Sequence, residues 1–70
     1  MKIIILDFST TEVFIFPYDE NIYDDVEDFF DSAYCTDRGI RETNCQYMVS
    51  DNLTLQILWK HGNGKMNIYL

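Results

Sequence analysis

Continuous and alternating runs of apolar residues predict β-strands near both ends of the chain. At the N-terminus, apolar and β-branched residues dominate positions 3–8 and 12–16, with the hydroxyl-rich sequence Ser9-Thr10-Thr11 between them. Pro17 should end the second run, because proline lacks the N–H that a strand ladder needs. Strands joined by so short a turn must be antiparallel, so residues 3–16 predict a β-hairpin.

The middle of the chain predicts an amphipathic α-helix in the sequence DENIYDDVEDFFDSAY, at residues 19–34. Apolar residues recur here at the spacing of one helical face, and Asp19 or Asn21 is expected to cap the N-terminus. The apolar face comprises Ile22, Val26, Phe29, Phe30 and Ala33. The opposite face is acidic and comprises Asp24, Asp25, Glu27, Asp28 and Asp31.

The C-terminal half predicts three further strands after a loop at residues 35–44. The first occupies residues 45–49 and is followed by a turn at residues 50–52. Residues 53–60 alternate between apolar and polar side chains, as expected for a strand with one buried face. The sequence HGNG at residues 61–64 favours a tight turn, and a last strand is predicted at residues 66–70.

These elements predict one small α+β domain over residues 1–70. Their order is ββαβββ, which gives a mostly antiparallel sheet with one amphipathic helix packed on one face. The first strand has apolar side chains on both faces, since Ile3 and Ile5 alternate with Ile4 and Leu6. One helix covers only one face, and a large exposed apolar surface is unusual on a monomer. The second face is therefore expected to be covered by the chain itself or buried against a partner, including a second copy in a homodimer.

The charge of the chain restricts its partners. Twelve acidic residues against five basic ones give a formal net charge of −7, and no basic residue occurs between Lys2 and Arg38. Direct binding to nucleic acid or to an anionic membrane is not expected, because both repel an acidic chain. No apolar run approaches the ~18 residues of a membrane-spanning helix, and the first apolar run ends at Asp7, too early for a signal peptide. A cytoplasmic location is predicted.

Few residues point to catalysis or metal binding. Cys35 and Cys45 lie ten positions apart, and with the single histidine His61 they do not make a zinc set. We expect two reduced thiols, with a disulfide as the alternative, and a surface position for His61. Arg38 and Arg41 are expected to pair with neighbouring carboxylates or to bind a small anion. No cofactor, metal site or catalytic residue is predicted, and a small thiol enzyme is the least favoured function.

The sequence Asp7-Phe8-Ser9-Thr10-Thr11 resembles the first hairpin of the actin-like ATPase and sugar kinase superfamily, in which a strand ends in Asp-x-Gly-Thr-Thr/Ser. The resemblance implies that Asp7 would help to hold a metal ion and that the turn would cradle phosphate. Ser9 replaces the glycine that lets backbone approach phosphate, and 70 residues are too few for that family's two domains. A plain hairpin is therefore expected, with hydroxyl groups bonded to the backbone of its own turn.

Two longer segments resemble those of short bacterial proteins of unassigned function. They are MKIIILDF at the start of the chain and IYDDVEDFF in its middle. This resemblance implies no activity, so the function has to be inferred from the surface that the chain presents.

The acidic face of the predicted helix is the strongest candidate for a binding surface. Like charges three or four residues apart on a helix each destabilise it by about 0.2–0.5 kcal/mol, and no basic residue within the helix relieves them. Calcium is not expected, because Asp24 and Phe30 stand where an EF-hand loop needs glycine and glutamate. The sequence predicts a non-enzymatic binding or regulatory module for a protein partner with a basic surface. A structural homodimer, and an inhibitor whose carboxylates mimic DNA phosphates, are the alternatives.

Overall fold

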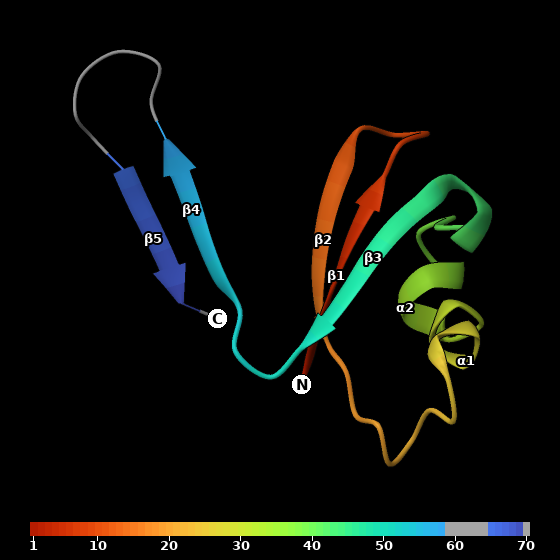
Figure 1. The fold of residues 1–70 in the computed structure, drawn as a ribbon. Helices are drawn as coiled ribbons and strands as arrows, with labels where there is room; N and C mark the ends of the chain where they lie inside the picture. Colours follow the sequence, from red (N-terminus) through yellow and green to blue (C-terminus); the bar gives the residue numbers. More distant parts are fainter. Residues whose placement is uncertain (59–64, 70) are drawn as a thin grey trace.

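The computed structural model describes residues 1–58 and 65–69 of the chain and divides its strands between two sheets (Figure 1). A three-stranded sheet and two short helices form the N-terminal part, and a two-stranded hairpin follows. The elements in chain order are β1 (Lys2–Asp7), β2 (Glu12–Pro17), α1 (Val26–Phe30), α2 (Ala33–Thr36), the 3₁₀ helix η1 (Glu42–Asn44), β3 (Cys45–Ser50), β4 (Thr54–Leu58) and β5 (Lys65–Tyr69). The mixed α+β class is confirmed, whereas the order ββαβββ with a single helix is not.

The three-stranded sheet is antiparallel, and β1 lies at its centre in the order β2-β1-β3. Ile5 pairs with Phe14 on one side and with Tyr47 on the other. Directly paired residues share a face of the sheet, and the next residue along each strand lies on the opposite face. Ile3 and Ile5 are fully buried, so their face is the one that packs against the helices.

The predicted helix over residues 19–34 is broken into two pieces, and carboxylates set where the first begins. Asp25 is the N-cap of α1, and its Oδ1 accepts a hydrogen bond from the Asp28 backbone N–H at 3.0 Å. Asp28 Oδ2 in turn accepts one from the Asp24 N–H at 3.1 Å. Neither Asp19 nor Asn21 caps the helix as predicted, because Asp19 Oδ1 instead closes a local turn onto the Asn21 N–H at 2.9 Å. Aspartate competes for backbone hydrogen bonds in this way, which favours caps and turns over helix interiors.

The end of α1 is set by Ser32. The Ser32 hydroxyl donates to the Phe29 carbonyl oxygen at 2.6 Å, and Ser32 is also the N-cap position of α2. Ser32 lies in extended backbone, so the chain changes direction between the two helices. None of the helices in the part of the chain that the structure describes is long and apolar enough to cross a membrane.

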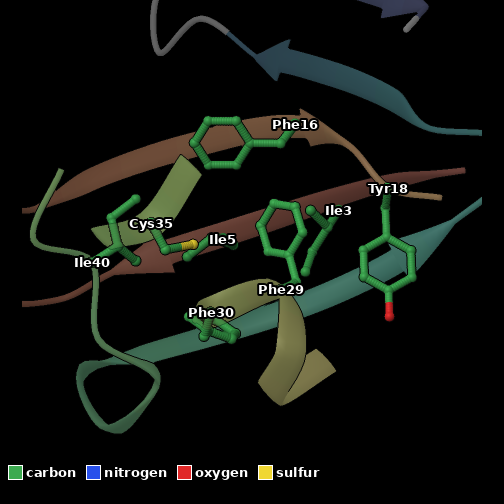
Figure 2. Close-up of a cluster of buried hydrophobic side chains, with 8 residues drawn as sticks. All are labelled: Ile3, Ile5, Phe16, Tyr18, Phe29, Phe30, Cys35 and Ile40. Atoms are coloured by element: carbon green, nitrogen blue, oxygen red, sulfur yellow. The ribbon is translucent and has the colours of Figure 1, made fainter. Parts of the chain in front are cut away.

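An aromatic cluster centred on Phe29 fills the core between the helices and the sheet. Phe29 is fully buried and lies among Ile3, Phe16 and Tyr18 (Figure 2). Its ring centroid is 5.8 Å from that of Phe16 and 5.6 Å from that of Tyr18, distances typical of favourable aromatic pairs. The apolar helix face predicted from the sequence is only partly correct, because Ile22 is 69% exposed.

The C-terminal strands β4 and β5 form a hairpin of their own. They pair antiparallel, with Thr54 opposite Tyr69, and the predicted turn at residues 61–64 lies outside the described residues. Among the described elements, neither strand makes extensive contact with anything but the other (Figure 1). The radius of gyration is 13.8 Å, against about 11 Å for a compact domain of this length. The hairpin therefore stands apart from the N-terminal sheet.

Replacing Phe29 with alanine should lower the free energy of unfolding by about 3–5 kcal/mol, because it leaves a cavity at the centre of the aromatic cluster. That is a large part of the roughly 4–10 kcal/mol expected for a domain of this length. Ile22→Ala is the matched control, and it should change the same quantity by less than about 0.5 kcal/mol. Urea denaturation followed by circular dichroism measures both. Equal losses would show that Ile22 and Phe29 share one buried face, as the sequence pattern predicts.

Candidate functional site

The turn between β1 and β2 is organised by Asp7. Asp7 is a buried polar residue, and its Oδ1 accepts hydrogen bonds from the Ser9 N–H at 2.9 Å and the Ser9 hydroxyl at 2.7 Å. The hydrogen bond from the Ser9 side chain lowers the pKa of Asp7, although burial opposes the shift. The carboxylate is therefore directed into its own turn, which differs from the expected bonding of hydroxyl groups to backbone. This arrangement supports a structural role for Asp7 and gives no support to the phosphate-binding role that the family resemblance implies.

The five carboxylates predicted to form an acidic helix face are all exposed, but they do not line one long helix. Asp25 and Asp28 are engaged in the hydrogen bonds that cap α1. Asp31 is the C-cap of α1, and Asp24 and Glu27 flank the cap. Within the described part of the chain, no group of three or more histidine, cysteine, aspartate or glutamate side chains is arranged to hold a metal ion.

Next to this acidic segment lies a surface hollow of about 470 Å³. Tyrosine rings and carboxylates contribute to its walls, including those of Tyr18, Tyr23, Tyr34, Glu20 and Asp51. Aromatic faces and carboxylates both attract cations, so the hollow suits a positively charged group such as a lysine or arginine side chain. The sequence did not suggest this site, because Asp51 and the tyrosines come from separate segments of the chain.

Both cysteines are free thiols, and their surroundings disfavour the thiolate form. Cys35 is fully buried in the core, and the loss of solvation raises its pKa to about 11. Desolvation also raises the pKa of Cys45, and the nearby Asp7 carboxylate adds to the shift. A nucleophilic cysteine needs a lowered pKa, so neither thiol has the environment of a catalytic group. His61, the other candidate for acid–base chemistry, lies outside the described residues.

Arg38, which was expected to pair with a carboxylate or to bind a small anion, lies against α2 and the aromatic core. Its Nη1 donates to the Tyr34 carbonyl oxygen at 2.9 Å, and its guanidinium carbon lies 5.3 Å from the centre of the Phe16 ring. A guanidinium at this distance from a ring makes a cation–π interaction. Arg38 therefore stabilises one edge of the aromatic core.

The second face of the three-stranded sheet carries mostly apolar residues, together with Lys2, Gln46 and Ser50, and α1 and α2 lie on the opposite side (Figure 1). Leu6 of β1 is 39% exposed, Val13 of β2 is 59% exposed and Met48 of β3 is 51% exposed. Ile4 and Ile15 are half-buried between them. We name this surface, formed by Ile4, Leu6, Val13, Ile15 and Met48, the open sheet face. The sequence predicted apolar residues on this side of the sheet, and the structure places them together.

Replacing Asp7 with asparagine should reduce stability at neutral pH and not at acidic pH. A lowered pKa in the folded state means that the carboxylate contributes stability above its ordinary pKa of 3.8, and that this contribution is lost as the pH falls through the folded-state value. The unfolding free energies of wild type and Asp7→Asn should therefore begin to converge as the pH falls below about 4, and become equal below the folded-state pKa of Asp7. Urea denaturation between pH 3 and pH 7 measures the difference. A difference that is constant over this range would contradict the structural role of the carboxylate.

No protein-family model, curated protein or solved structure matches this chain. The geometry described above is consequently the basis for a functional proposal. Among the surfaces described, the open sheet face gathers the most apolar exposed side chains, and the acidic segment with its hollow gathers the most charge.

Proposed function

We propose that this protein is a non-enzymatic binding module whose working surface is the open sheet face. The observation that carries the proposal is the exposure of Leu6, Val13 and Met48, which come from all three strands. Contiguous apolar surface of this kind usually marks a site of interaction with another protein. The apolar core of a protein interface is depleted of charge, and this face carries no carboxylate.

The positions of the acidic residues in the sheet also favour the open sheet face as the binding surface. Asp7 and Glu12 are paired with each other, and the register places both on the side of the sheet that faces the helices. Burying the open sheet face against a partner would therefore desolvate no negative charge of the sheet, and the free energy of burying a charge is large and unfavourable. An apolar partner surface fits this face better than a basic one.

The state of the titratable groups also supports a role without chemistry. The most perturbed thiol, Cys35, has a raised pKa and stays protonated at neutral pH, and the lowered pKa of Asp7 follows from hydrogen bonds within its own turn. General acid–base catalysis needs a pKa near the working pH, and nucleophilic catalysis needs an activated nucleophile. Two free thiols also fit the reducing cytoplasm, which is where we place the protein.

A second candidate function uses the acidic segment, and the hollow beside it is the observation that favours it. Asp24, Glu27 and Asp31 are exposed, and the neighbouring hollow of about 470 Å³ combines carboxylates with tyrosine rings. A basic protein, including one that binds DNA, is the partner such a surface would attract. In this reading the carboxylates stand in for the phosphates of nucleic acid.

A photo-crosslinking residue in place of Val13 should capture a polypeptide in cells that express the protein. Val13 is central to the open sheet face and well exposed, so p-benzoylphenylalanine at this position leaves the core untouched. The same residue in place of Thr43, which is exposed in η1, is the matched control. Mass spectrometry of the adducts identifies the captured chain. Equal labelling at both positions, or none at Val13, would contradict the proposal.

The acidic candidate is tested by removing charge without removing hydrogen-bonding groups. Asp24→Asn, Glu27→Gln and Asp31→Asn together should weaken binding to a column of immobilised basic protein, such as histone, and lower the salt concentration that elutes the chain. Asp25 and Asp28 are left unchanged because they cap α1. The matched control also removes three negative charges, but outside the acidic segment, as Glu12→Gln, Asp37→Asn and Glu42→Gln. Equal elution of the triple variant and the wild type would reject this candidate.

A further inference from the structure

The pairing of β4 with β5 places apolar residues at neighbouring positions on one face of their hairpin. The register places Leu55 opposite Ile68 and Ile57 opposite Met66, and these four apolar positions share one face of the hairpin. In the described first part of β4 the burial alternates as expected, since Leu55 is half-buried and its neighbours are exposed. An isolated two-stranded hairpin is at best marginally stable in water, so this one needs a surface to pack on.

The open sheet face is the complementary surface in the same chain. Two sheets pack face to face about 10 Å apart when each presents an apolar side. Three strands of six residues cover roughly 300 Å² in plan, and two strands of five residues add roughly 160 Å². The accessible area is larger than these flat values, because side chains project from the sheet. A hairpin covers no more of the face than its own plan area, so two reciprocal contacts bury roughly 320 Å² in plan on each copy, twice what a single contact buries.

The distribution of charge permits a second copy of this chain as the occupant. With a net charge of −7, two copies repel each other over most of their surfaces. The open sheet face is free of carboxylates, because Asp7 and Glu12 both lie on the helix side of the sheet. It is therefore a surface on which two such acidic chains meet without placing like charges in contact.

The connection between the two sheets favours exchange between copies over closure within one copy. Only residues 51–53 separate β3 from β4. They are held by hydrogen bonds between Ser50 and Asn52, at 3.0 Å and 3.3 Å, and by the buried side chain of Leu53. Val13 and Met48 remain exposed although the hairpin belongs to the same chain. Short connections of this kind favour the swapping of an element between identical chains.

We propose that the protein forms a twofold-symmetric homodimer in which the β4–β5 hairpin of each copy packs on the open sheet face of the other. The inference rests on the proposed function, since it names the partner of the same surface. Each copy supplies one hairpin and receives one, which is the self-complementary arrangement that a twofold axis requires. In the dimer each hairpin gains an apolar surface to pack on, and part of each open sheet face is covered.

Sedimentation at micromolar concentration tests the dimer, with an expected mass of twice 8.3 kDa. Val13→Glu should weaken association about tenfold or more, because it buries an unpaired carboxylate against the apolar hairpin of the other copy. Thr43→Glu makes the same change of charge at an exposed position outside the sheet and should leave association unchanged. Circular dichroism shows whether each variant retains the fold.

Exchange of the hairpins is tested on an equal mixture of ¹⁴N- and ¹⁵N-labelled chains, each with the photo-crosslinker at position 13. Crosslinks that join a ¹⁴N peptide to a ¹⁵N peptide, and reach residues of β4 or β5, are the expected result. A dimer whose mixed crosslinks join only the two three-stranded sheets would overturn the exchange. A monomer of 8.3 kDa that captures another protein in cells would overturn self-association and leave the proposed function intact. A monomer with crosslinks only within one chain would overturn both.

Discussion

The packing of Phe29 onto the buried side of β1 is the interaction on which the rest of the N-terminal structure depends. The helix that carries it has five residues and the next has four, far fewer than a helix needs to persist alone in water. Both helices therefore exist because they bury side chains in the core with Ile3 and Ile5, namely Phe29 and Phe30 of α1 and Cys35 of α2. The same contact fixes which face of the sheet is inside, and the acidic residues around α1 stay in solvent as a result.

This constraint leaves an excess of apolar surface elsewhere. Two helices of this length cover one side of three strands, and the second side gathers exposed side chains such as Val13 and Met48. The β4–β5 hairpin also lacks a surface to pack on, since among the described elements its two strands make extensive contact only with each other. A small acidic chain with two unmatched apolar surfaces is expected to satisfy them by association, which lowers the exposed apolar area without burying charge.

Within the described residues, the five strands were predicted with small errors at their ends, because runs of β-branched and aromatic residues bounded by turn residues are a local signal. The helix was predicted too long for a physical reason. Ile22 has the spacing of a buried helical residue, but Asp25 and Asp28 hold the helix start farther along by accepting backbone N–H groups. The spacing of apolar residues does not show where aspartate side chains will accept hydrogen bonds from the backbone and so shift the start of a helix. Among the candidate sites, the acidic residues were foreseen as exposed, whereas the contact of Arg38 with Phe16 joins segments far apart in sequence.

The sequence by itself determined the class of the protein, its acidic surface, the first hairpin and the presence of apolar residues on both faces of its strands, because these follow from residue type and local spacing. Only the tertiary structure decided that β3 pairs beside β1, that the helices cover one face alone, and that β4 and β5 form a separate sheet. Those outcomes depend on contacts between segments that are far apart in the sequence. The free energy of such contacts comes from shape and burial, which no local pattern of residues specifies.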